Sequence, residues 1–132
     1  MPDLRGAEAL LNMARKDLMA LRGMLSEATF SDEIFGFHAQ QAVEKGLKCW
    51  LSILVSDFPR THDLQLLFSL LIEANADITP EMKLLEDLTD FAVIFRYGEV
   101  DLGESMDRPN VISQVADLID YVGEVLNLYK RQ

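Results

Sequence analysis

The sequence has a single cysteine, Cys49, among its 132 residues. One thiol cannot form an internal disulfide bond, and it leaves no set of cysteines for a zinc site. The sequence also lacks a His-Glu-x-x-His motif, a glycine-rich phosphate loop and a Gly-x-Ser-x-Gly motif. These absences argue against a disulfide scaffold, a zinc enzyme, a P-loop nucleotide hydrolase and an α/β-hydrolase. We therefore expect a protein of a reducing compartment that needs no metal or other cofactor.

Long apolar runs are also missing. The longest, from Leu64 to Ile72, contains Gln65 and Ser69 and falls short of the roughly 20 residues that a membrane span needs. The N-terminal segment carries acidic and amide side chains where a signal peptide would be apolar, at Asp3, Glu8 and Asn12. The sequence therefore predicts a soluble, cytoplasmic protein without a membrane partner.

Basic residues are scarce, since 12 Lys and Arg stand against 22 Asp and Glu and the net charge is -10. Broad binding to DNA or to another nucleic-acid backbone needs a basic surface that displaces counterions. The composition argues against that function class but leaves room for a small local anion site. An acidic surface also suits a basic protein partner, because complementary charge speeds encounter.

The pattern that is present is helical throughout. Apolar residues make up 49% of the chain, enough for the core of one domain spanning residues 1–132. They recur at spacings of three and four, and no segment shows the alternation of a strand. The pattern predicts helices over 4–29, 31–55, 61–74, 80–97 and 111–131. We therefore predict an all-α, up-and-down four-helix bundle with an additional short helix.

Caps and breakers set the expected boundaries. Ser31 is predicted to cap the second helix, Thr61 the third, and Thr79 with Pro80 the fourth. Gly23 is expected to weaken the first helix without ending it. Residues 98–110, which contain two Gly, one Pro and several carboxylates, are expected to form a long loop.

The middle of the second predicted helix has two faces. At about 100° per residue, apolar side chains from Ala39 to Leu54, including Trp50, gather on one side. The opposite side collects His38, Gln41, Lys45 and Lys48. A cationic strip in so acidic a chain suggests a bound anion. The alternative is that Lys45 and Lys48 are surface lysines paired with Glu44 or with carboxylates of neighbouring helices.

Three sequence blocks carry a family resemblance. They are Phe37-His38-Ala39-Gln40-Gln41-Ala42-Val43-Glu44-Lys45-Gly46-Leu47-Lys48, then Arg60-Thr61-His62-Asp63-Leu64, then Phe95-Arg96-Tyr97. In this order they resemble the prokaryotic HEPN domain family over residues 37–97. The resemblance implies the same helical bundle and a homodimer with its functional groups in or near the groove between protomers. It also implies a small nucleotidyltransferase partner, as in toxin–antitoxin-like systems.

The second block offers an imidazole at the start of a helix. An imidazole can act as an acid or a base near neutral pH, so His62 is a candidate for that role, with the neighbouring Asp63 setting its tautomer. In the alternative interpretation Thr61 caps the helix, Asp63 supports its first turn and His62 fills a space between helices.

The third block decides between catalysis and binding. Catalytic HEPN ribonucleases pair an Arg with a His that follows after four to six intervening residues. After Arg96 those positions hold Asp101, Leu102 and Gly103, so the His is absent. The resemblance therefore favours a non-catalytic module that binds a nucleotide or the nucleotidyltransferase. The first alternative is a metal-independent ribonuclease, and the second alternative is a purely structural helical dimer.

The candidate anion site joins four residues from the three blocks. Lys45, Lys48, His62 and Arg96 are expected to converge on a phosphate, because Arg binds it through a bidentate fork while Lys contributes a point charge. His38, Gln41, Arg60 and Tyr97 are the expected supporting residues. No residue is assigned a catalytic or metal-binding role.

Overall fold

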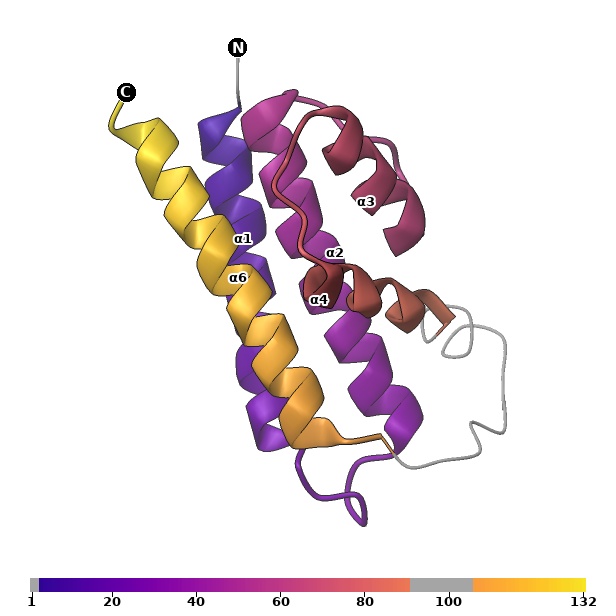
Figure 1. Ribbon diagram of the computed structural model, residues 1–132. Coiled ribbons are helices and arrows are strands. Elements are labelled where there is room, and N and C mark those ends of the chain that lie inside the picture. The colour runs from indigo at the N-terminus through magenta and orange to yellow at the C-terminus, as the bar shows by residue number, and fades with distance from the viewer. Residues whose placement is uncertain (1–2, 91–105) are drawn as a thin grey trace.

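The computed structural model describes residues 3–90 and 106–132. All regular structure in these residues is helical (Figure 1), and the all-α bundle is confirmed. The elements are α1 (Leu4–Gly23), α2 (Asp32–Leu54), α3 (Leu64–Glu73), α4 (Pro80–Lys83), the 3₁₀-helix η1 (Leu84–Leu88) and α6 (Arg108–Lys130).

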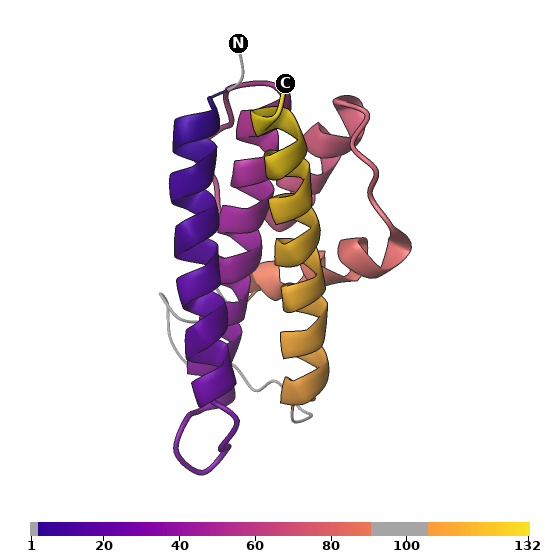
Figure 2. The ribbon, with the colours of Figure 1, turned by 90° about the vertical axis from the view of Figure 1, so that its left-hand side faces the viewer.

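Three long helices form the body of the bundle. Helices α1, α2 and α6 lie side by side, with α1 antiparallel to α2 and α6 returning toward the N-terminal end of α1 (Figures 1 and 2). The antiparallel pairing of the first two helices agrees with the predicted up-and-down arrangement. None of the helices in the described ranges is long and apolar enough to span a bilayer.

Helix α2 is the central element, because it packs against α1, α3, η1 and α6. Trp50 is 2% exposed and meets the ring of Tyr121 edge to face at 5.2 Å between centroids, which confirms its predicted burial. The polar side of α2 is also covered, since Gln40 is 0% and Glu44 is 4% exposed. The helix therefore has less solvent-exposed surface than its two-faced pattern predicts.

Helix α3 lies parallel to α2 rather than antiparallel to it. The linker after α2 doubles back, so that the carbonyl of His62 accepts a hydrogen bond from Gln40 Nε2 at 3.1 Å. At the other end of α3, Leu70 and Ala74 face Leu51 at one pocket. Ser56 has a φ of 68° at the point where the chain reverses after α2.

Two of the three predicted caps are confirmed. The Ser31 and Thr79 hydroxyls accept from the backbone N–H groups of Ile34 and Met82, and Pro80 occupies the first turn. The prediction of Thr61 as the third cap is wrong. Asp63 caps α3, and Thr61 Oγ1 accepts from the Asp63 N–H at 3.0 Å instead.

The first helix ends at Gly23, not at Thr29 as predicted. The reason lies partly in α6, where the buried guanidinium of Arg108 donates to the carbonyls of Met24 and Phe30 at 2.7 and 2.6 Å. It also donates to the carbonyl of Ser26 and to Asp32 Oδ1, at 3.2 and 3.0 Å. These acceptors can converge on one side chain only if the segment after Gly23 leaves the helix.

The fourth and last helices also differ from their predicted bounds. After the single turn of α4 the chain tightens into η1, whose period of about three residues places Leu85 and Leu88 on the same, buried side. Helix α6 begins at Arg108 with Asp107 as its cap, three residues earlier than predicted. The rest of the predicted fourth helix, 91–97, and positions 98–105 of the predicted loop lie outside the described residues.

Candidate functional site

A buried carboxylate organises the polar side of α2. Glu44 Oε1 lies 2.8 Å from His62 Nδ1 and accepts from Gln40 Nε2 at 2.9 Å. Its second oxygen, Oε2, accepts from Lys48 Nζ at 3.0 Å. We call Gln40, Glu44, Lys48 and His62 the Glu44 cluster. Gln41 extends it by donating from Nε2 to Gln40 Oε1 at 2.8 Å.

The sequence positions explain why this cluster forms. Gln40, Glu44 and Lys48 stand four residues apart, so they form one stripe along α2. His62 arrives from the linker that returns along the same helix, and its backbone carbonyl is fixed by Gln40. Two elements distant in sequence therefore meet at one carboxylate.

The charge state of Glu44 follows from its neighbours. Burial raises the pKa of the carboxyl. The hydrogen bonds from Gln40, His62 and Lys48, together with the charge of Lys48, lower the pKa by more than burial raises it. The net effect places the pKa below its ordinary value of 4.5. Glu44 is therefore ionised at neutral pH and matches the positive charge of Lys48.

A second ion pair lies beside the cluster. Lys45 Nζ contacts Asp17 Oδ2 of α1 at 2.6 Å. The Nδ1 atom of His38 lies 3.6 Å from Asp17 Oδ1, too far for a hydrogen bond. The predicted cationic strip is thus divided into two groups, each with its own carboxylate.

The lysine pairs fit the alternative interpretation of the strip in one respect and differ in another. Lys48 pairs with Glu44, and Lys45 pairs with a carboxylate of the neighbouring helix, as that alternative states. The side chains are only 22% and 13% exposed for Lys45 and Lys48, however. They are partly buried, ordered donors rather than solvated surface lysines.

His62 is positioned by a different carboxylate from the one predicted. Asp63 Oδ1 accepts from the backbone N–H groups of Gln65 and Leu66, whereas Glu44 contacts the imidazole. The His62 side chain is 43% exposed and that of Glu44 is 6% exposed. The imidazole is therefore held from its buried side and open to solvent on the other.

The remaining predicted residues are distributed as follows. Arg60 is exposed on the linker, while Arg96 and Tyr97 lie outside the described residues. Near the end of the first described range, Thr89 Oγ1 accepts a hydrogen bond from the N–H of Leu64, at the start of α3, at 3.0 Å. Leu64 is two residues from His62, so Thr89 lies at the end of α3 that is close to the Glu44 cluster.

Sequence reasoning missed Gln40 and Asp17, and it treated Glu44 only as a surface partner for lysine. The repeat at positions 40, 44 and 48 was the available signal for two of these residues. Asp17 has no comparable signal, because its role depends on how α1 packs on α2. Within residues 3–90 and 106–132, no group of three or more His, Cys, Asp or Glu side chains is placed to hold a metal ion.

Comparison with known proteins identifies the family. The family model described as HEPN domain matches residues 7–132. Comparisons with curated proteins and with solved structures gave no match. The match includes α6 and nearly all of α1, beyond the residues 37–97 that carried the resemblance in sequence. With 126 of its 132 residues matched, the chain belongs to the HEPN domain family.

Proposed function

We propose that this protein is a non-catalytic HEPN module that acts as a cytoplasmic homodimer and binds a nucleotide, together with a small nucleotidyltransferase partner. The observation that carries the proposal is the Glu44 cluster. It holds Lys48 and His62 in fixed positions, and Thr89, which precedes Arg96 by seven residues in the sequence, contacts Leu64 at the start of α3. Donors that are ordered before a ligand arrives lose little conformational entropy on binding.

The charge balance of the cluster gives Arg96 a special part in this proposal. Lys48 and Lys45 are matched by Glu44 and Asp17, respectively. A phosphate group therefore needs a further cation, and the bidentate fork of an arginine is well suited to it. Lys48 and His62 then contribute as hydrogen-bond donors more than as net charge.

The test is nucleotide titration combined with co-purification. ATP and GTP are titrated by calorimetry into the protein alone and into its complex with a nucleotidyltransferase encoded beside it. We expect Arg96→Ala to weaken nucleotide binding at least about tenfold, or about 1.4 kcal/mol, with little change in Tm. Arg131→Ala, which removes an exposed cation at the end of α6, is the matched control and should leave affinity unchanged. Absence of nucleotide binding by both the protein and the complex would refute the proposal.

One observation favours ribonuclease activity as the second candidate. His62 is paired with an ionised, buried carboxylate and is open to solvent, an arrangement that suits a general acid or base. His62 would then replace the histidine missing after Arg96. Cleavage of RNA in the presence of EDTA that is lost in both His62→Gln and Arg96→Ala would establish this activity instead.

A further inference from the structure

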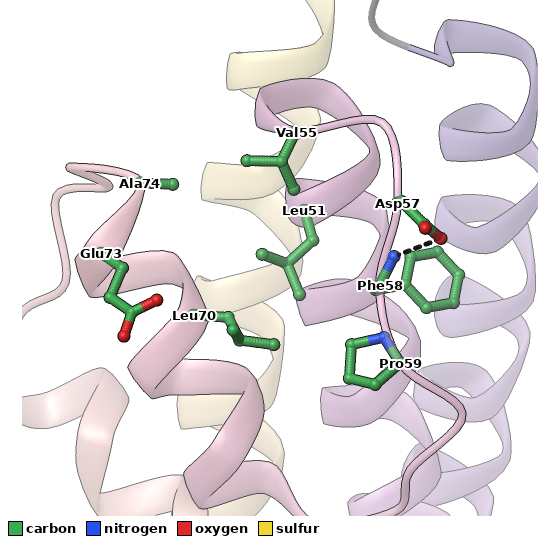
Figure 3. A pocket seen from close by; sticks show the side chains of 8 residues that line it. All are labelled: Leu51, Val55, Asp57, Phe58, Pro59, Leu70, Glu73 and Ala74. Carbon is green, nitrogen blue, oxygen red and sulfur yellow. Dashed lines mark hydrogen bonds between the residues drawn. The ribbon is translucent and has the colours of Figure 1, made fainter.

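An open apolar pocket lies where α2 and α3 both end, between α3 and the linker (Figure 3). Its volume is about 620 Å³. The apolar lining comes from Leu51, Val55, Phe58 and Leu70, of which Leu51 is buried and Val55 is 48% exposed. None of the four residues of the Glu44 cluster lines it. We call this cavity the α2–α3 pocket.

The pocket has acidic walls on two sides. Asp57 lies on the linker wall and Glu73 on the α3 wall (Figure 3). Within the described ranges neither carboxylate forms an ion pair with a Lys, Arg or His side chain. Asp57 Oδ1 accepts from the neighbouring Phe58 N–H, at 2.8 Å.

The backbone adds to this negative potential. Helix α2 ends at Leu54 and α3 ends at Glu73, so the carbonyl ends of two helices face the same region. A helix C-terminus carries partial negative charge and favours a cation in its last turn, yet α3 has Glu73 there. Lys48 Nζ lies 5.6 Å from the centre of the Phe58 ring, but this lysine is paired with Glu44.

We propose that the α2–α3 pocket binds a short basic segment of a partner protein. A large apolar side chain of that segment occupies the pocket, and flanking Lys or Arg residues face Asp57 and Glu73. The two carboxylates stand on opposite walls, so a ligand must place cations on both sides of one apolar group. A peptide chain meets this requirement more readily than a compact molecule does. The net charge of -10 also favours encounter with a basic partner.

This proposal is separate from nucleotide binding, and its test has a different readout. A phage library of random dodecapeptides is selected on the wild-type protein and depleted on the double variant Asp57→Asn/Glu73→Gln. The amide introduced by Asp57→Asn still presents a side-chain oxygen to the Phe58 N–H, so the change removes charge while keeping the local hydrogen bond. We expect enriched peptides to carry an aromatic or aliphatic residue flanked by Lys or Arg.

A synthetic peptide of the enriched sequence, labelled with fluorescein, is then measured by anisotropy. We expect the double variant to bind at least about tenfold more weakly, and the wild-type affinity to fall as salt rises. Ala74→Leu, which fills the pocket from α3, should weaken binding by a similar factor. The matched control is Asp120→Asn/Glu124→Gln on the exposed side of α6. It removes the same charge elsewhere and should bind within about twofold of wild type.

Four results would overturn the proposal. In the selection, these are a failure to enrich peptides on the wild type over the double variant, or enrichment of uncharged or acidic peptides. In the anisotropy measurement, it is an equal loss of affinity in the control variant. In sedimentation, it is dissociation of a dimer by Ala74→Leu. The last result would make the pocket a contact between copies of the chain. Nucleotide titration of the same variants separates the two proposals, because we expect the nucleotide affinity to stay at the wild-type value.

Discussion

The strongest stability prediction concerns Arg108. Its side chain is 2% exposed, donates to three backbone carbonyls and to Asp32, and stacks on Phe35 at 5.0 Å. Arg108→Ala leaves all four acceptors without this donor. Removing one member of a buried ion pair costs about 3–5 kcal/mol. The Asp32 side chain is 24% exposed and can be rehydrated in part, so we expect about 3–4 kcal/mol.

A second variant of Arg108 separates the geometry of its guanidinium from its charge, and a variant elsewhere serves as the control. Arg108→Lys keeps the charge but cannot serve several diverging carbonyls at once, so we expect about half of the loss seen for alanine. Arg5→Ala, at an exposed position in the first turn of α1, is the control and should change stability by less than about 0.5 kcal/mol.

The assay is urea unfolding followed by the fluorescence of Trp50, the single tryptophan of the chain. A marginal domain has about 5–15 kcal/mol of stability, so Arg108→Ala should remain folded without urea and unfold at a lower midpoint. A loss below about 1 kcal/mol would refute the reasoning. It would mean that water satisfies the carbonyls of the segment after α1 as well as the guanidinium does.

Three further predictions use other buried groups. Trp50→Ala, which removes the fluorescent probe, should cost about 3–5 kcal/mol by urea unfolding followed by circular dichroism, and a cost under about 1 kcal/mol would contradict its place in the core. The lowered pKa of Glu44 means that its pairing stabilises the fold above pH 4.5 and that this contribution is lost as the pH falls through the folded pKa. Glu44→Gln should therefore flatten the pH dependence of stability in this acid range, and an unchanged slope would contradict the pairing. Burial raises the pKa of Cys49 to about 12, so Ellman's reagent at pH 8 should react with the native protein only as it unfolds, and rapid labelling without urea would exclude a buried thiol.

The sequence was most informative where local chemistry decides the structure. Ser31 and Thr79 cap helices because a short hydroxyl side chain can reach the N–H three residues later. The helical spacing of apolar residues likewise predicted the body of the bundle and the burial of Trp50. These features depend on neighbours within one or two turns, which a sequence displays directly.

Prediction failed where a distant segment competes with local preference. The first helix has enough apolar periodicity to continue beyond Gly23, but Arg108 binds the carbonyls that follow it. Thr61 is an acceptable cap, but the backbone folds so that Asp63 takes that position. Nothing near Gly23 in the sequence indicates that the guanidinium of Arg108 will bind the carbonyls of the residues that follow.

The structure brings Lys48 and His62 together at Glu44, and their role in an anion site stays a prediction. The carboxylate partners of Lys45 and Lys48 are those that the alternative interpretation of the strip named. The pattern did not indicate that Glu44 is buried, because the cover comes from a linker that doubles back along α2. Arg96 and Tyr97 lie outside the described residues, so their roles stay predictions.

The central position of α2 has a consequence for any partner that touches both proposed surfaces. Glu44 and Val55 belong to the same uninterrupted helix and its C-terminal cap, which rises about 1.5 Å per residue and so separates them by about 16 Å along its axis. Since α2 is packed on several sides by other helices, the helix is held straight and the distance between the two surfaces is fixed. A partner that reaches both surfaces must match that length, and a flexible partner must supply a spacer of similar reach.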